Sequence, residues 1–128
     1  MKTPCNIEWI TIPAPNLDLA KQFYSLVFGF KVSKHSNRFW VFEAGNLNGG
    51  FDSDQKASQH GVGFSITVQD ISKSIEAIQK HGGKIVKQAY PLGKNTGFCA
   101  SFTDPNGNLL ELYSTTHTNF IPTNCNSD

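Results

Sequence analysis

The two halves of this chain repeat one order of expected elements, and this internal repeat constrains the fold more than any other feature of the sequence. Gly29 and Gly83 each follow a stretch with helical spacing of apolar residues, and they lie 54 residues apart. The same offset superposes Asn16 on Asp70, which are suitable N-cap residues for the two helices. Each half then predicts a strand, a helix and three further strands. The sequence therefore predicts an α+β fold in which two tandem βαβββ modules form a curled, barrel-like mixed sheet with the helices outside.

The bounds of these elements follow from apolar periodicity and from turn residues. The first half predicts strands over 6–13, 30–33, 38–43 and 50–53, a helix over 17–28, and a turn-rich stretch over 45–50. The second half predicts strands over 62–68, 84–86, 97–103 and 108–113 and a helix over 71–81. The sequence Asp104-Pro105-Asn106-Gly107 is typical of a tight turn ahead of the closing strand.

We expect a single domain over residues 1–128. Its first module covers residues 5–53 and its second module covers residues 61–114. Residues 54–60 are polar and lack periodicity, so they are predicted to form a linker. Residues 115–128 are rich in Thr and Asn and are predicted to form a flexible tail.

The near-neutral charge limits the kinds of partner that this chain can have. Eleven Lys and Arg residues against ten Asp and Glu residues give a formal net charge of +1. Nucleic acids and anionic membranes both require a basic patch, so we expect neither as a main partner. The first residues lack a leader pattern and no apolar run could span a bilayer, so we predict a cytoplasmic protein. The three cysteines lack C-x-x-C spacing, which argues against a disulfide framework and a zinc site.

Several motifs resemble those of the vicinal oxygen chelate superfamily, which includes glyoxalase I, the extradiol dioxygenases and the bleomycin resistance proteins. The motifs are F-Y-S-L-V-F-G-F over 23–30, V-Q-D-I over 68–71, H-G-G-K over 81–84 and F-T-D-P-N-G-N-L-L-E-L over 102–112. The resemblance covers about residues 6–114. It implies paired βαβββ modules whose sheets curl around a cavity. It also implies a homodimer in which modules of two chains face one another.

The resemblance further implies where a metal would bind. In metal-dependent members, the first and last strand of each module supply the ligands, and the corresponding residues here are Trp9, Phe51, Gly63 and Glu111. Only Glu111 has a side chain that can bind a divalent ion. A slip of one residue would bring Glu8 into the place of Trp9, but the register of the repeat opposes it. We therefore predict no metal and no cofactor.

The same mapping predicts a cavity with aromatic side chains, a few hydroxyls and one carboxylate. Such a mixture suits a small, partly apolar organic ligand. Gly63 leaves room where the metal-dependent members carry a larger side chain. Strand parity gives the candidate ligand-binding residues as Trp9, Thr11, Phe51, Gly63, Ser65, Thr67, Leu109 and Tyr113.

Three functions remain open from the sequence. The first is metal-independent binding of a small molecule, in the manner of the bleomycin resistance proteins. The second is a glyoxalase-like lyase or isomerase with Glu111 as its general base. The third is a non-catalytic interaction module.

Several of these residues also have structural interpretations. Glu111 could be a structural residue paired with Tyr113 or Arg38, and Trp9 and Phe51 could fill a closed core. Cys99 is expected to be a buried, inert thiol. The four histidines lie outside the mapped positions and are expected to be solvated.

Overall fold

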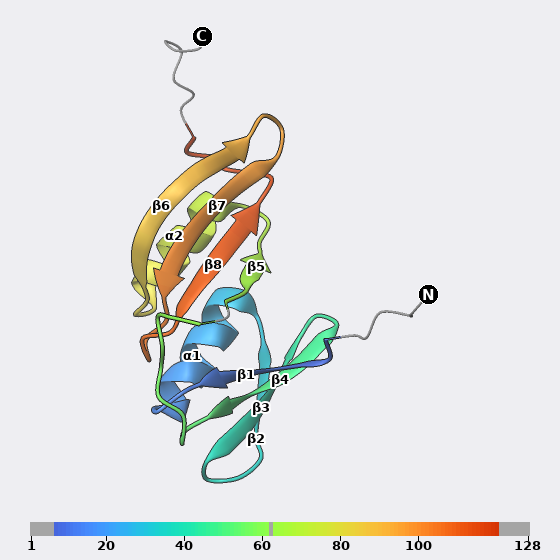
Figure 1. Ribbon diagram of the computed structural model, residues 1–128, viewed down its shortest axis with the longest axis vertical. Coiled ribbons are helices and arrows are strands. Elements are labelled where there is room, and N and C mark those ends of the chain that lie inside the picture. Colours follow the sequence, from blue (N-terminus) through green and yellow to red (C-terminus); the bar gives the residue numbers. More distant parts are fainter. Residues whose placement is uncertain (1–6, 62, 121–128) are drawn as a thin grey trace.

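The computed structural model describes residues 7–61 and 63–120. It consists of two βαβββ modules, each with a four-stranded mixed sheet, and so confirms the predicted α+β class (Figure 1). The first module contains β1 (Trp9–Pro13), α1 (Leu17–Phe28), β2 (Lys31–Lys34), β3 (Phe39–Ala44) and β4 (Leu47–Asp52). The second contains β5 (Ser65–Thr67), α2 (Ile71–Lys80), β6 (Lys84–Gly93), β7 (Gly97–Thr103) and β8 (Leu109–Ser114).

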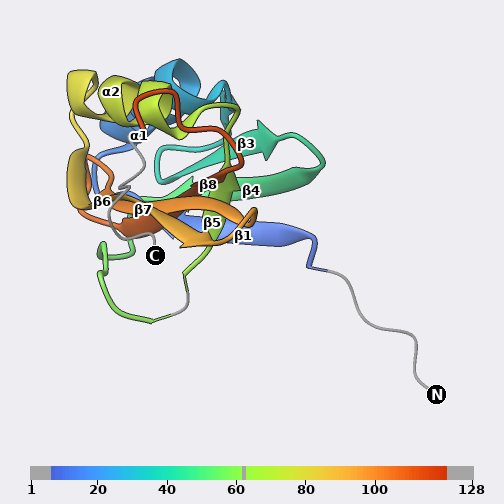
Figure 2. The same ribbon diagram turned by 90° about the horizontal axis from the view of Figure 1, so that it is seen from above.

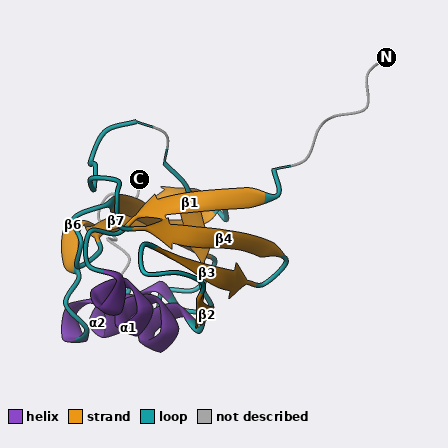
Figure 3. Cartoon of the chain, turned by 90° about the horizontal axis from the view of Figure 1, so that it is seen from below, coloured by secondary structure: helices purple, strands orange, loops and turns teal. Residues whose placement is uncertain are grey.

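The two sheets have equivalent topologies, with strand orders β1-β4-β3-β2 and β5-β8-β7-β6. The first strand of each module pairs in parallel with the last strand, and the other pairs are antiparallel. Both helices lie on one side of the two sheets (Figures 2 and 3). The opposite faces of the sheets point away from the helices, and we call them together the open face.

Local capping explains why the helix bounds could be read from the sequence. The Asn16 side chain accepts a hydrogen bond from the Leu19 amide at the start of α1, and Gly29 ends the helix with φ of 73°. Asp70 caps α2 by accepting from the Ser72 amide. The observed bounds of α1 match the predicted range, and α2 ends one residue before the predicted end. Neither helix of the described chain has the length and apolar character that crossing a membrane requires.

Aromatic side chains fill the core between α1 and the sheets. Phe23, Tyr24, Phe51 and Phe102 are almost completely buried. The ring centroid of Phe51 lies 5.1 Å from that of Tyr24 and 4.9 Å from that of Phe42. Aromatic pairs at this separation stabilise the fold by more than the burial of their apolar area alone. Much of the aromatic content of the chain therefore serves packing.

A buried carboxylate joins the two modules. Asp104, in the turn after β7, accepts hydrogen bonds from the Tyr24 hydroxyl of α1 at 2.8 Å and from the Asn108 side-chain amide at 2.9 Å. Asn108 also donates to the Pro13 carbonyl of β1 at 2.6 Å. We call these residues the Asp104 network. Burial, followed by the charge of Asp104 and its hydrogen bond, raises the pKa of Tyr24 well above its ordinary value.

A second pair of contacts fastens the same turn to the start of α1. The Asn16 amide donates to the Asn106 side-chain oxygen at 2.8 Å, and the Asn106 side-chain amide donates to the Asn16 carbonyl at 3.1 Å. The predicted turn over 104–107 therefore also holds the modules together.

Four strands differ from their predicted ranges by several residues, and β2, β3 and β8 are each shifted by one residue. β1 begins at Trp9 rather than at residue 6. β4 begins at Leu47 and passes through Gly49 and Gly50, within the stretch predicted as turn. β6 runs to Gly93 rather than ending near residue 86, because it pairs with β7 across several register shifts. β5 is only three residues long.

Residues 115–120 fold back onto the start of α2. The Thr118 hydroxyl donates to Asp70 at 2.8 Å, and the His117 ring is hydrogen-bonded to the Ser72 hydroxyl. The Phe98 and Phe120 rings lie 4.9 Å apart. His117 is half-buried, as is His81 at the end of α2, so the expectation that every histidine is solvated is wrong for these two residues. Residues 121–128 of the predicted tail lie outside the described residues.

Candidate functional site

The register of the sheets identifies the equivalent positions of the two modules. Thr11 pairs with Gly50 in the first module, and Ser65 pairs with Glu111 in the second. Because Thr11 and Ser65 are equivalent in the repeat, the counterpart of Glu111 is Gly50. Phe51 is the residue predicted at this position from the sequence, but it is fully buried beneath α1 and does not line the open face.

The difference of one residue arises in the hairpin turns. Phe42 and Phe102 each stand last but one in the predicted strands over 38–43 and 97–103, so the repeat makes them counterparts. Phe42 pairs with Gly49, whereas Phe102 pairs with Leu110. The connection from Phe102 to its partner is thus one residue longer than the connection from Phe42 to its partner. Since the side-chain period of a strand is two, one extra residue exchanges the faces of the last strand.

Two aromatic residues form a ledge on the open face of the first module. The Trp9 and Phe39 rings are stacked, with an interplanar angle of 12° and centroids 6.2 Å apart. The Trp9 indole donates to the Thr11 hydroxyl at 3.1 Å, and Trp9 is 46% exposed, so it does not belong to a sealed core. A Cβ atom at Gly50 would lie 2.2 Å from Cζ of Phe39. We call Trp9 and Phe39 the aromatic ledge.

The open face of the second module is more polar. The Ser65 hydroxyl donates to the Glu111 carboxylate at 3.0 Å, and Glu111 is exposed. Neither expected partner of Glu111 is bonded to it. Arg38 pairs with Asp54, and the Tyr113 hydroxyl donates to the Thr96 carbonyl at 2.6 Å.

Tyr90 and Cys99 lie opposite each other on β6 and β7. A hydrogen bond with Cys99 raises the pKa of Tyr90, with further contributions from the Cys99 charge, from desolvation and from Glu111. Lys87 lies over the Tyr90 ring, 4.1 Å from its centroid. Cys99 is buried, as predicted. Tyr90 and Lys87 could not be placed here from the sequence, because they lie in the part of β6 that was not predicted as strand.

The segment before β5 brings several of the predicted residues together. A cavity of about 360 Å³ is bordered by Gly63, Leu109 and Glu111. A smaller cavity of about 130 Å³ is bordered by Thr11, Gly63 and Leu109. No atom lies within 4 Å of the Cβ position at Gly63, so the room expected there is present. Thr67 is exposed on β5, two residues from Ser65.

The residues at the four equivalent positions do not fit a divalent ion. These residues are Trp9, Gly50, Gly63 and Glu111, and only Glu111 offers a donor side chain. Over residues 7–61 and 63–120, no three side chains of the types His, Cys, Asp and Glu gather closely enough to hold a metal. A single carboxylate does not hold a catalytic ion against water.

Comparisons with known proteins agree with the fold. The family model described as the Glyoxalase/Bleomycin resistance protein/Dioxygenase superfamily matches residues 6–112. The chain is 31% identical over 112 residues to a putative lactoylglutathione lyase of Brassica oleracea var. gemmifera, covering 76% of this chain and 40% of that protein. It is also 31% identical over 112 residues to a glyoxylase-like domain-containing protein of Didymella fabae, covering 80% of this chain and 88% of that protein. The chain thus spans 40% of the length of the plant relative.

Solved structures of low sequence identity share the fold. A glyoxalase/bleomycin resistance protein/dioxygenase family enzyme from Burkholderia phytofirmans PsJN superposes with a TM-score of 0.72 at 18% identity, covering 84% of this chain and 97% of that chain. The fosfomycin resistance protein FosX from Listeria monocytogenes superposes with a TM-score of 0.70 at 19% identity, covering 88% of this chain and 94% of that chain.

Proposed function

The chain belongs to the glyoxalase/bleomycin resistance protein/dioxygenase superfamily, and on this premise we propose that its open face binds a small, partly apolar organic molecule without a metal ion. One observation carries the proposal: the Phe39 ring stands over Gly50, the counterpart of Glu111, and stacks on Trp9. An aromatic surface thus occupies the place where metal-dependent members carry a ligand. Exposed aromatic rings beside a few polar groups are typical of sites for such molecules.

We assign the binding roles by side-chain chemistry. The aromatic ledge and Leu109 supply apolar contact, and Gly63 supplies room. Hydroxyl groups and the carboxylate orient the polar part of the ligand; these belong to Thr11, Ser65, Thr67, Tyr113 and Glu111.

Ligand binding is expected to quench Trp9 fluorescence saturably. We select 4-nitrobenzyl alcohol as the probe, because its ring can stack on Trp9, its hydroxyl can bond to polar groups and its nitro group quenches indole emission. Gly63→Leu fills the space beside Leu109 and should weaken binding about tenfold or more, equivalent to at least about 1.4 kcal/mol. Phe39→Ala should weaken it similarly, whereas Phe120→Ala, which removes an exposed ring elsewhere, should not. Linear quenching that does not saturate, or equal binding by all variants, would contradict the proposal.

The purified protein is expected to carry no stoichiometric divalent ion, and EDTA should leave its melting temperature unchanged. The reason is the single donor among the four equivalent positions. Elemental analysis and thermal melts with and without EDTA provide the measurements. About one tightly held metal per chain would contradict this part of the proposal.

We also propose a homodimer, because a second chain facing the aromatic ledge would remove the exposed Trp9 ring from water. Light scattering at micromolar concentration should report about twice 14.1 kDa, and a monomeric mass would contradict the proposal. The cytoplasmic location stays a prediction.

A glyoxalase-like lyase is the second candidate, favoured by the Brassica relative named "Putative lactoylglutathione lyase" at 31% identity. Glu111 would act as the general base, with the Ser65 hydroxyl orienting its carboxylate. Assays for formation or breakdown of S-lactoylglutathione, with Glu111→Gln as the comparison, test this candidate. Activity that survives Glu111→Gln would exclude the assigned role, and no activity with saturable probe binding would favour the binding function.

A further inference from the structure

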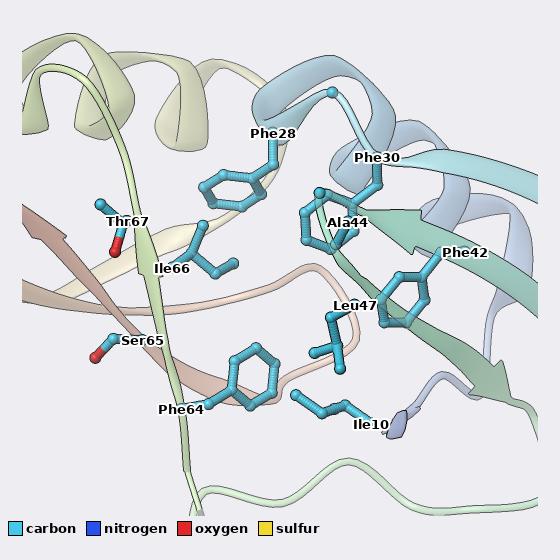
Figure 4. A pocket seen from close by; sticks show the side chains of 12 residues that line it. Ile10, Phe28, Phe30, Phe42, Ala44, Leu47, Phe64, Ser65, Ile66 and Thr67 are labelled. Atoms are coloured by element: carbon cyan, nitrogen blue, oxygen red, sulfur yellow. The ribbon is translucent and has the colours of Figure 1, made fainter. Parts of the chain in front are cut away.

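We propose that a second binding site, for a small neutral aromatic molecule, lies between the two modules on the helix side of the sheets. A cavity of about 400 Å³ occupies this position (Figure 4). Its volume falls within the range of about 300–1,000 Å³ that is usual for small-molecule sites. This site would be separate from the open face to which the proposed function belongs.

Side chains from both modules form the apolar walls of this cavity. They are Ile10, Phe28, Phe30, Phe42 and Leu47 from the first module and Phe64 and Ile66 from the second. None of the twelve lining residues carries a charge. Burying a charged ligand without a partner is costly, so the lining selects a neutral molecule. Aromatic rings on both sides favour an aromatic one.

Strand parity separates the cavity from the open face. Ile10 lies between Trp9 and Thr11 on β1, and Ile66 lies between Ser65 and Thr67 on β5. Successive side chains of a strand point to opposite faces, so the two isoleucines face the helix side. Figure 4 shows the Ser65 and Thr67 side chains pointing away from the cavity.

The edge of β5 supplies polar groups to the cavity. β5 is an edge strand, paired with β8 alone. The Phe64 carbonyl accepts from the Glu111 amide, and the Val68 amide donates to the Tyr113 carbonyl. In a parallel pair the backbone groups of successive residues point alternately to the two edges of the strand. The backbone groups of Ser65 and Thr67 therefore point to the edge of β5 opposite β8. Because both line the cavity while their side chains point away, a ligand there meets their backbone N–H and C=O groups.

The apolar side chains that line this cavity are more exposed to solvent than those of the rest of the core. Ile10, Phe28, Phe30, Leu47 and Phe64 are each only half-buried. By contrast, the core aromatics beneath α1 are almost fully buried. A ligand would remove the exposed apolar surface from water and contact both modules at once. We therefore assign the cavity to an aromatic molecule with one hydrogen-bonding group.

N-phenyl-1-naphthylamine tests this assignment, because it is neutral, has two aromatic ring systems and carries one N–H donor. Its fluorescence should rise saturably with the protein, and the Ser65 and Thr67 backbone amides should shift in ¹H–¹⁵N spectra. Ala44→Phe adds a ring at a residue that lines the cavity and should weaken binding about tenfold or more, equivalent to at least about 1.4 kcal/mol. Val86→Phe adds the same ring at an exposed position on β6 and should leave binding unchanged.

Leu47→Arg is a second cavity variant, in case Ala44→Phe does not fold. It introduces a charge into the apolar lining and should likewise weaken dye binding. Thermal melts verify that each variant is folded. Loss of dye binding in Trp9→Ala but not in the cavity variants would overturn the proposal, because the dye would then occupy the open face. Unshifted Ser65 and Thr67 amides at saturation would also overturn it. The open-face proposal is judged separately, by the quenching of Trp9.

Discussion

Asp104→Ala is expected to destabilise the protein by about 3–5 kcal/mol, because several buried donors would lose one acceptor. Asp104 is only 4% exposed, and Tyr24 is fully buried. The substitution leaves the Tyr24 hydroxyl and the Asn108 side chain without this carboxylate, and the backbone amides of Asn106 and Asn108 also lose it. Urea unfolding, followed by the fluorescence of buried Trp40, measures the change in free energy.

Asp54→Ala is the control, because it also removes a carboxylate but from an exposed pair with Arg38. Its cost should stay below about 1 kcal/mol. Equal costs for Asp54→Ala and Asp104→Ala would contradict the role assigned to the Asp104 network.

Alkaline unfolding gives a second readout of the Asp104 network. Folding raises the pKa of Tyr24, so its contribution to stability is present below its ordinary pKa, near 10, and is lost as the pH rises through the raised value. Tyr24→Phe should therefore show a smaller loss of stability above about pH 10 than the parent. The pKa of Tyr90 is also raised, so Tyr90 can contribute to the same loss of stability at high pH. Tyr90→Phe, measured in parallel, shows how much of the loss belongs to Tyr90 rather than to Tyr24.

Gly49→Leu is expected to cost about 3 kcal/mol or to prevent folding, because a side chain at this position has no space. A Cβ atom at Gly49 would lie 2.2 Å from the Ile10 carbonyl oxygen and 2.4 Å from Cζ of Phe42. The carbonyl belongs to the backbone of the paired strand and cannot move independently of it. Urea melts of purified protein measure the cost.

Gly63→Leu is the matched control, since no atom lies within 4 Å of its Cβ position. Its cost should stay within about 0.5 kcal/mol. If the two leucine variants were equally stable, the close approach at Gly49 would not be what requires glycine there.

The parts of the fold that depend on local signals could be predicted from the sequence. The bounds of α1 follow from Asn16 and Gly29, and both act within one turn of the helix. β4 could not be predicted in the same way, because glycine is disfavoured in strands by its own propensity. The reason for Gly49 is a neighbour on β1, nearly forty residues earlier in the chain, and such contacts leave no periodicity in the local sequence.

The candidate site was predictable to the same extent. Trp9, Ser65 and Glu111 were found through the repeat and the family motifs, and all three lie on the open face. Phe51 was misplaced because one extra residue in the second hairpin changes strand parity there. Phe39 was missed, although the alternation of side chains along its strand could have placed it. Trp40 and Phe42 are buried on one face, so Phe39, which directly precedes Trp40, lies on the other face. Tyr90 depends on the pairing of β6 across register shifts, which no local pattern reports.

The contact between Phe39 and Gly50 restricts how this chain could change by single substitutions. A glutamate introduced at Gly50 would place its Cβ atom against the Phe39 ring, so the first step toward an additional metal ligand is sterically unfavourable. To make room, Phe39 would have to become smaller or its ring would have to rotate, and either change would break the stack with Trp9. The side chains that positions 39 and 50 can carry are therefore sterically coupled. A carboxylate at position 50 and the aromatic ledge therefore exclude each other, whichever of the two positions changes first.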